Sequence, residues 1–489
     1  MNVFIFILYT CVLFSVSQGF IIEWWEKIFG RSKDNSSKPK HNDPNSRILY
    51  KFLDLDVKPC DNFYKFACGK WIKTMEKEYG NFGSFNHRTD TFDKFANGEK
   101  KYNDESKMLS TLVYLRDKCS QDLPNDKVYS CGNEIFEFGK YALSSVFLRR
   151  NIKNFEHNNG NLSVNQIYLN IKEQFILLID EKEHLFDLDT RRYFKDKINH
   201  LKLATSFDDH HLSNVEHMEN CYYNSIGINY NDHISTILAN INNLKALSQN
   251  DDLTTCRGKI FQISKFMPLI VYGNGLYDPN QNLIAINSGL VNEPSYAWYF
   301  KYPLNYGYLG NIMAHEMLHG FDSNNYNRTL ANKISDYKVS QMSMENYEKK
   351  ASCFVDQYNK QIESKTNMYI DGSRTLAENI VDNGGLKVAH RAYMKFRERN
   401  NHKNSPVKDF EQFNDEQLFF ISVGRNFCEH KNKYILEQLI NGDNHTPSEI
   451  RTNMMLSNYQ PFIDAFNCPV SSKMNREHKC ELWKSQKQN

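Results

Sequence analysis

Two histidines and a glutamate in the middle of the chain have the spacing of a metal site. They are His315, Glu316 and His319, in the pattern His-Glu-x-x-His. Residues four apart on a helix lie on the same face, so both histidines can bind a single metal ion. Glu316 lies next to the first histidine, where it can accept a proton from a metal-bound water. A helix is favoured by the apolar residues of the segment, which are Ile312, Met313, Met317 and Leu318.

The pattern by itself has an ordinary alternative explanation. Because the chain has 16 histidines among 489 residues, chance alone produces such a match in roughly a few per cent of chains of this size. Two histidines on an amphipathic helix can also be satisfied by a carboxylate or by water. A hydrolytic zinc site needs a third protein ligand and one open position.

A later segment supplies the third ligand. In metzincins a glycine and a third histidine follow the motif, but Asp322 and Asn325 occupy those positions here, which excludes that class. Glu378 and Asp382 lie four residues apart and therefore on one face of a predicted helix. This spacing suits Glu378 as a ligand and Asp382 as the carboxylate that orients a ligand histidine. The two glycines that follow allow the backbone to turn or to pack closely.

These segments and their surroundings resemble the neprilysin family of zinc metallopeptidases. The matching motifs run in the family's order from about Tyr272 to Trp483. They are Asn274-Gly-Leu-Tyr277, which resembles the family's Asn-Ala-x-Tyr strand, then Leu304-Asn-Tyr-Gly307, Glu378-Asn-x-x-Asp382, Gln417-Leu-Phe-Phe420, His445-Thr-Pro-x-x-x-Arg451 and Cys480-x-x-Trp483. Two segments nearer the start, Cys60–Trp71 and Tyr79–Phe82, are similar to the family's opening motifs.

The resemblance implies a fold and a metal. The fold is mainly α-helical, a two-lobed zincin of the gluzincin type with a small β component in the catalytic lobe. One Zn²⁺ per chain is bound by His315, His319 and Glu378, and Asp382 lies behind these ligands in the outer shell.

The resemblance also implies roles in catalysis and substrate binding. Glu316 acts as general base, and His445 donates a hydrogen bond to the oxyanion that develops during peptide hydrolysis. Arg451 binds a backbone carbonyl of the substrate, and Asn274 and Gly275 pair with its main chain as an added strand. Without the resemblance, a capped loop and a surface charge would explain His445 and Arg451 equally well. An apolar pocket that favours cleavage before hydrophobic residues is expected to be lined by Phe82, Ile312 and Phe427.

The function expected from these features is that of a secreted zinc metalloendopeptidase acting on extracellular peptides. Two departures from the family pattern limit this expectation. Only 17 residues separate Cys256 from Asn274, where family members have many more, so the N-terminal helical lobe is shortened. The alternative is therefore a non-catalytic peptide-binding or structural homologue. Glu78 also stands where some members have an arginine that binds a peptide's terminal carboxylate.

The sequence divides into four predicted parts. Residues 1–19 form an apolar run that ends in Ser-Gln-Gly, which predicts a cleaved signal peptide and export. A retained membrane anchor is the alternative, although the run is shorter than the roughly 20 apolar residues that span a bilayer. Residues 20–47 are expected to be a spacer, 48–265 the helical lobe and 266–489 the catalytic domain. A net charge of +2 gives no reason to expect nucleic acid or an anionic membrane as partner.

The cysteines and potential glycosylation sites agree with export. Ten cysteines follow Cys11, an even number that is typical of a disulfide framework. The resemblance implies the pairs Cys60–Cys468, Cys68–Cys428, Cys119–Cys256 and Cys353–Cys480, which leaves Cys131 and Cys221 to pair with each other. Acceptor motifs for N-glycosylation begin at Asn35, Asn161 and Asn327.

Overall fold

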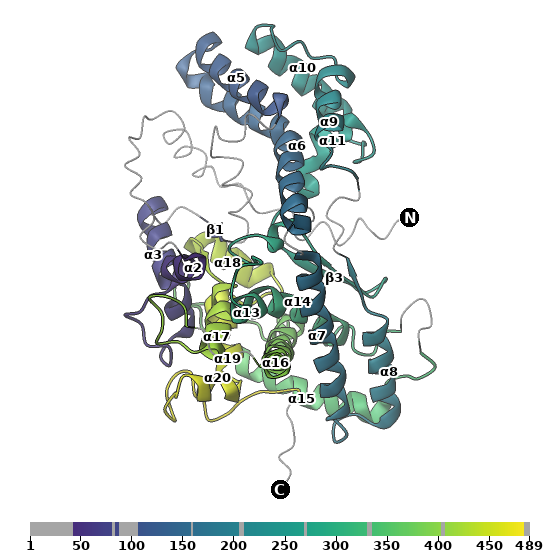
Figure 1. Ribbon diagram of the computed structural model, residues 1–489, viewed down its shortest axis with the longest axis vertical. Helices are drawn as coiled ribbons and strands as arrows, with labels where there is room; N and C mark the ends of the chain where they lie inside the picture. Colours follow the sequence, from purple (N-terminus) through teal and green to yellow (C-terminus); the bar gives the residue numbers. More distant parts are fainter. Residues whose placement is uncertain are drawn as a thin grey trace.

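The protein is mainly helical, which confirms the predicted fold class. The computed structural model describes residues 43–80, 84–87, 106–157, 160–204, 210–267, 271–329, 335–401 and 406–483. A small lobe of helices stands above a larger main lobe, and the two are joined through the long helix α6 and its continuation α7 (Figure 1). Each lobe has its own hydrophobic core.

The small lobe is built from two consecutive antiparallel helices and a second group of shorter ones. Its elements are α5 (Lys107–Asp122), α6 (Asn125–His157), α9 (Val215–Asn220), the π-helical turn η2 (Cys221–Ser225), α10 (Ile234–Leu247), α11 (Cys256–Gln262) and η3 (Ile263–Lys265). Apolar residues of α5, α6, α10 and α11 meet in its core. The C-terminal end of α6 leads down into the main lobe (Figure 1).

The main lobe surrounds two central helices with further helices and two small sheets. Its helical elements are α2 (Pro44–Phe52), α3 (Phe63–Tyr79), α7 (Gly160–Asp180), α8 (Leu188–Asn199), η4 (Ser288–Val291), α13 (Tyr302–Asn305), η5 (Tyr306–Gly310), α14 (Asn311–Leu318), η6 (His319–Phe321), α15 (Gln341–Asn359), α16 (Leu376–Arg399), α17 (Asp415–Arg425), α18 (Lys433–Gly442), α19 (Ser448–Ser457) and α20 (Gln460–Ala465).

Both sheets are short, and one of them presents an edge strand. Strand β1 (Phe85–Asn86) pairs antiparallel with β5 (Glu429–His430). The other sheet has the order β2 (Lys202–Ala204), β4 (Leu283–Ile286), β3 (Gly275–Asp278). Strand β3 pairs antiparallel with β4, and within the described residues its other edge is unpaired. The segment 274–277, which resembles the family's substrate strand, thus coincides with β3 within one residue at each end.

The hydrophobic core of the main lobe contains residues from both sides of the domain boundary expected at residue 265. Side chains of α3, such as Phe63 and Trp71, and of α7, such as Phe175, are buried in the core of the main lobe. The described chain also enters helix at Pro44, four residues before the expected start at Ile48. Asp43 caps this helix, because its Oδ2 accepts a hydrogen bond from the Ser46 backbone N–H at 3.0 Å. In space, the main lobe thus includes segments far upstream of residue 266.

The segment that carries the His-Glu-x-x-His motif is the central helix of the main lobe. Helix α13, the π-helical turn η5, α14 and η6 follow one another without a break from Tyr302 to Phe321. Residues Ala314, Met317 and Leu318 are fully buried, which fixes the face that the two histidines do not occupy. A π-helical turn of this kind is frequently found beside functional sites.

Two glycines bring α16 into direct contact with α14. A Cβ on Gly385 would lie 2.9 Å from the backbone nitrogen of His315, and one on Gly384 would lie 3.2 Å from Cδ1 of Leu318. Helix α16 continues through both glycines. Of the two roles considered from the sequence, a turn and close packing, the structure shows close packing.

Five disulfide bonds join the ten cysteines that the structure describes, and three of these bonds confirm the expected pairs. These are Cys60–Cys468, Cys68–Cys428 and Cys353–Cys480. The first two attach the N-terminal segment to the C-terminal part of the chain. They close loops with sequence separations of 408 and 360 residues.

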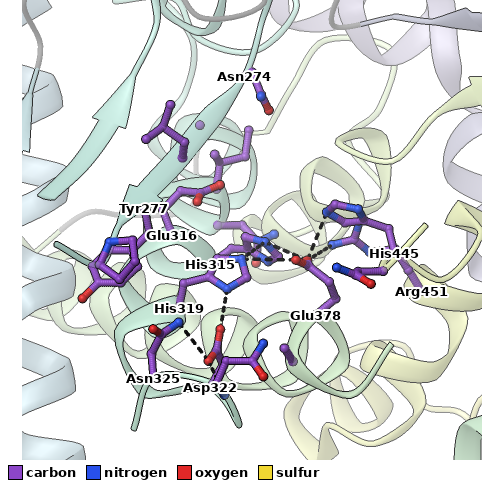
Figure 2. A pocket seen from close by; sticks show the side chains of 18 of the residues that line it. Asn274, Tyr277, His315, Glu316, His319, Asp322, Asn325, Glu378, His445 and Arg451 are labelled. Atoms are coloured by element: carbon purple, nitrogen blue, oxygen red, sulfur yellow. Dashed lines mark hydrogen bonds and ion pairs between the residues drawn. The ribbon is translucent and has the colours of Figure 1, made fainter. Parts of the chain in front are cut away.

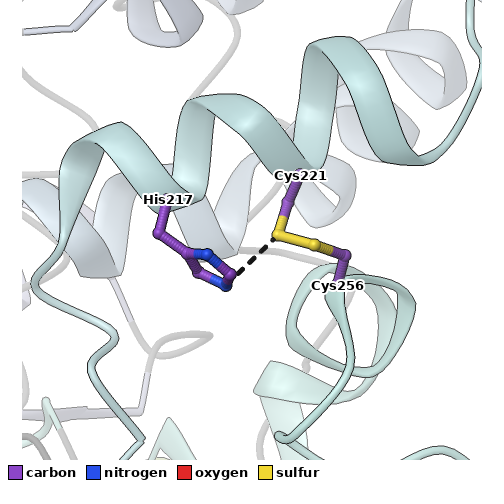
Figure 3. A group of neighbouring side chains, drawn as sticks. All are labelled: His217, Cys221 and Cys256. Carbon is purple, nitrogen blue, oxygen red and sulfur yellow. Dashed lines mark hydrogen bonds between the residues drawn. A yellow bond between two sulfur atoms is a disulfide. The ribbon is translucent and has the colours of Figure 1, made fainter.

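The pairing predicted for the small lobe is wrong. Cys119 pairs with Cys131 and Cys221 with Cys256, rather than 119 with 256 and 131 with 221. The reason is local, because the short connection between α5 and α6 brings the Cα atoms of Cys119 and Cys131 to 5.9 Å. His217 lies beside the second bond, with Nε2 3.6 Å from Sγ of Cys221 (Figure 3). Both sulfurs of this group are therefore used by the disulfide and are not available to a metal ion.

The predicted glycosylation sites fall in different places. Asn35 lies outside the described residues, Asn161 lies in α7, and Asn327 is exposed in the loop after η6. Glycosylation of these sites stays a prediction. No helix among the described residues is long and apolar enough to cross a membrane.

Replacing Cys119 and Cys131 together by serine should not release additional thiols. In the observed pairing these two cysteines bond to each other, so Cys221 and Cys256 stay oxidised. Titration of the denatured, non-reduced protein with a thiol reagent should give the same count as wild type. Two additional thiols would instead support the pairing inferred from the resemblance.

The substitution Gly385→Ala should destabilise the main lobe. Its methyl group would meet the His315 backbone, which cannot move aside as a flexible side chain does. Overpacking of this kind costs about 1–3 kcal/mol of unfolding free energy. Denaturant unfolding checks this, with Gly442→Ala as control, because nothing lies within 4 Å of a Cβ at that position. Equal stability of the two variants would contradict the packing role of Gly385.

Candidate metal centre and its cleft

The three residues predicted as metal ligands converge on one point. The Nε2 atoms of His315 and His319 lie 3.2 Å apart. Glu378 approaches both rings, with Oε2 3.4 Å from Nε2 of His315 and Oε1 3.5 Å from Nε2 of His319 (Figure 2). Ligands at 2.0–2.1 Å from a tetrahedral zinc ion lie about 3.3 Å from each other. The three separations therefore match the edges of a tetrahedron around zinc.

The hydrogen bonds of the two imidazoles indicate a cation between them. Nδ1 of His315 lies 3.0 Å from Asp382 Oδ1, and Nδ1 of His319 lies 2.8 Å from Asp322 Oδ2. Both Nδ1 atoms therefore donate to carboxylates, which leaves the Nε2 lone pairs directed at each other. Two lone pairs at this distance repel unless a proton or a metal ion lies between them. The residues present thus fit a metal ion in their donor atoms, their tautomers and their spacing.

The charges around the ligands favour positive charge at the same point. Burial alone lowers the pKa of His315, but hydrogen bonds to Asp382 and Glu378 outweigh burial and raise it to about 9. Burial alone raises the pKa of Glu378, but the charge of His445 and the contacts with His315 hold it well below its usual range. Glu378 is therefore a carboxylate, the form that binds metal.

Asp322 is a site residue that the sequence analysis did not assign. It was used only to exclude the metzincin pattern, yet its buried side chain orients His319. Its Oδ1 atom accepts hydrogen bonds from the Asn324 backbone at 2.8 Å and the Asn325 amide at 3.2 Å, which fix the carboxylate. The spacing of three residues from His319 was the available indication, since it places a carboxylate one helical turn beyond a ligand.

Asp382 lies where an outer-shell carboxylate was expected, and Arg451 binds it. The guanidinium donates from Nε to Oδ2 and from Nη2 to Oδ1, each at 2.7 Å. Burial alone raises the pKa of Asp382, but the charge of Arg451 and the bond to His315 lower it to about 2. Arg451 was expected to bind a substrate carbonyl, and the structure places it in the cleft wall with this second partner. Its Nη2 also lies 3.5 Å from Glu378 Oε2.

The metal centre lies in a cleft of about 410 Å³ whose lining includes Glu316 and strand β3. Figure 2 shows Asn274 and Tyr277 of this segment on one side of the cleft and His445 and Arg451 on the other. Glu316 lies against β3, because a Cβ on Gly275 would be 2.9 Å from its Oε1. The predicted base and the predicted substrate strand are thus direct neighbours.

His445 reaches the cleft from the loop between α18 and α19. Its Nδ1 lies 2.7 Å from Asp443 Oδ1, and its Nε2 lies 3.2 Å from Glu378 Oε2. Desolvation alone lowers the pKa of this half-exposed imidazole, but Glu378 and Asp443 outweigh it and raise the pKa to about 10. Asp443 therefore fixes the ring with Nε2 directed at the metal centre.

The structure describes two of the three residues predicted to line the apolar pocket. Ile312 and Phe427 both line the cleft and are almost fully buried. Phe82, the third predicted residue, lies outside the described residues. All described residues that line the cleft belong to the segment 274–451, so none of the described small-lobe residues contributes to its walls.

Comparison with known sequences agrees with this geometry. Residues 274–482 match the profile of Peptidase family M13. The chain is 28% identical over 386 residues to Neprilysin-1 of Caenorhabditis elegans, an alignment that covers 78% of this chain and 49% of the relative. It is 30% identical over 325 residues to human neprilysin, covering 65% of this chain and 42% of the relative. Residues 274–482 are therefore similar in sequence to the neprilysin family of peptidases.

The match has clear limits in length. The chain spans about half the length of these two curated relatives. An endothelin-converting enzyme homolog of Locusta migratoria is 35% identical over 210 residues, which is 43% of this chain and 28% of that protein. The range that matches the family profile, 274–482, includes His315, His319 and Glu378.

Solved structures show the same fold at low sequence identity. A chain of the Haemonchus galactose containing glycoprotein complex superposes with a TM-score of 0.57 at 16% identity, covering 90% of this chain and 98% of that one. The zinc metalloprotease ZMP1 of Mycobacterium tuberculosis gives a TM-score of 0.50 at 17% identity, covering 73% and 51%. The first comparison shows that this fold also occurs in a solved chain of similar extent.

The substitution Asp322→Asn should weaken zinc binding by about 10- to 100-fold, as loss of an outer-shell carboxylate does elsewhere. The neutral amide no longer supports the orientation and basicity of His319. Competition with a chromophoric chelator measures the affinity. Asp189→Asn on the exposed side of α8 is the matched control, and equal affinity of both variants would contradict the role of Asp322.

Proposed function

We propose that this protein is a zinc-dependent endopeptidase that hydrolyses extracellular peptides, with preference for bonds that precede a hydrophobic residue. The observation that carries the proposal is the convergence in one cleft of three ligand atoms at zinc-like spacing, an adjacent glutamate and an open strand edge. The match of residues 274–482 to Peptidase family M13 supports the same activity. Zn²⁺ is the proposed metal because two imidazoles and one carboxylate are a common ligand set of catalytic zinc.

The chain's own residues supply proton transfer. A bound zinc ion provides Lewis acidity and lowers the pKa of its water toward 7. Glu316 accepts the proton of the attacking water and delivers it to the leaving amine. Its contact with Gly275 keeps the carboxylate beside β3, where the scissile bond would lie if the peptide pairs with the strand edge.

His445 is proposed to stabilise the developing oxyanion. Asp443 holds its Nδ1, so the Nε2–H of the protonated ring is directed at the metal centre, where Nε2 lies 3.2 Å from Glu378 Oε2. A donor in this position contributes about 3–4 kcal/mol to the transition state. Arg451 keeps Asp382 in place, and we propose that its remaining donors contact the substrate backbone.

Substrate preference is proposed to come from the apolar side chains of the cleft. Ile312 and Phe427 form a wall beside the predicted ligands. A hydrophobic side chain following the scissile bond would lose apolar surface to water on binding there, and this is favourable by about 25 cal/mol per Å².

An extracellular setting is supported by the five disulfides, which form and persist in oxidising compartments. The exposed acceptor at Asn327 fits the same setting. Export through a signal peptide at residues 1–19 remains part of this proposal.

The substitution Glu316→Gln should abolish peptidase activity while leaving zinc content unchanged. Glu316 is not a ligand, and loss of a general base typically costs 10²- to 10⁴-fold in rate. Hydrolysis of a quenched fluorescent peptide with a hydrophobic residue after the scissile bond measures kcat, and metal analysis of the same samples measures zinc. A chelator should abolish wild-type activity, and added zinc should restore it.

The same experiment tests the alternative of a non-catalytic peptide-binding protein. That alternative is favoured by one observation, namely that none of the described small-lobe residues lines the cleft. Full zinc occupancy without turnover in the wild type would contradict the endopeptidase proposal and support the binding protein.

A further inference from the structure

One basic side chain in the cleft has no acidic partner. The described lining residues include two arginines, Arg374 and Arg451, and three histidines. Arg451 is paired with Asp382, and each histidine contacts a carboxylate. Within the described chain, no carboxylate forms an ion pair with Arg374, whose guanidinium donates only to backbone carbonyls. Arg374 therefore adds an uncompensated positive charge to the cleft wall.

The position of Arg374 is fixed by its surroundings. Its backbone N–H donates to Asp371 Oδ1 at 3.0 Å, and its Nη1 donates to the carbonyl of Asn441 at 2.8 Å. Its Nη2 donates to the carbonyl of Ile440. Guanidinium has five N–H donors, so several are left for another acceptor. The buried Nε has no hydrogen-bond partner among the described atoms.

Arg374 and residues of strand β3 line the same cleft. Arg374 precedes α16 and is four residues before Glu378, and the carbonyls that hold it end helix α18. The chain continues from α18 to His445, which lies across the cleft from Asn274 and Tyr277 (Figure 2). A peptide bound along β3 would thus lie in the cleft that Arg374 also lines.

We propose that Arg374 binds a carboxylate of the peptide substrate and so makes the cleft selective for acidic peptides. The carboxylate is either an acidic side chain or a free C-terminus, since both offer the same planar acceptor to a guanidinium. The inference rests on the proposed peptidase function. The competing structural role is a cap on the last carbonyls of α18, to which a cation is also attracted.

The test uses pairs of quenched fluorescent peptides. Each pair has Glu or Gln at one position near the scissile bond, and a further pair has a free or an amidated C-terminus. Wild type should prefer the carboxylate at one position by about 10-fold or more in kcat/KM, the value of a charge-assisted hydrogen bond. Arg374→Met should reduce this ratio to about one and leave the neutral peptide within about 3-fold of wild type. Arg374→Lys should keep part of the ratio.

A control variant and two possible outcomes decide whether Arg374 binds the substrate. Lys433→Met, at the exposed start of α18, should retain the wild-type ratio. An equal loss for all peptides in Arg374→Met, accompanied by a lower melting temperature, would assign Arg374 to the helix cap alone and overturn the proposal. A ratio of one in the wild type at every position would overturn it as well.

A measurement of peptide binding tests the role of Arg374 independently of the peptidase proposal. Fluorescence anisotropy of the labelled Glu and Gln peptides on wild type and Arg374→Met requires no turnover. A carboxylate preference that disappears in Arg374→Met supports the site even if no peptide is cleaved. Cleavage without any carboxylate preference would leave the endopeptidase standing and remove the role of Arg374.

Discussion

The metal centre depends on the close packing of α14 against α16. Helix α14 carries His315 and continues into η6, which begins at His319, and α16 carries Glu378. The separation of these two segments therefore fixes the three donor atoms. That separation is possible because Gly385 has no side chain where the His315 backbone passes. Asp382, one helical turn after Glu378, then reaches Nδ1 of His315 across the same interface. A small displacement of one helix would disturb a ligand and its supporting carboxylate together.

The charges buried at this interface are stable only as a group. Asp322, Asp382 and Glu378 are taken out of water, which by itself disfavours their ionised forms. Imidazole and guanidinium contacts compensate, and Arg451 neutralises Asp382 by donating to both of its oxygens. Such networks are costly when one member is removed, because the partner is left as an uncompensated buried charge. The arrangement therefore fixes the tautomers of both histidines as well as their positions.

Disulfides and helix packing make distant segments part of the main lobe. Cys60–Cys468 and Cys68–Cys428 attach the start of the described chain to its end. Helix α7 packs on α14 and α16. The main lobe therefore contains residues from before, between and after the segments of the small lobe. The small lobe has local disulfides and a separate core.

The sequence by itself determined the chemistry of the site, and the tertiary structure decided its surroundings. His315, His319, Glu378 and Asp382 were predictable because helical periodicity relates residues four apart, and β3 was predictable from its motif. The role of Asp322, the partner of Arg451 and the unpaired charge of Arg374 depend on contacts between separate elements, which spacing along the chain does not encode. The small-lobe disulfides and the division of the lobes depended likewise on which helices become neighbours, because packing joins residues by distance in space and not by order in sequence.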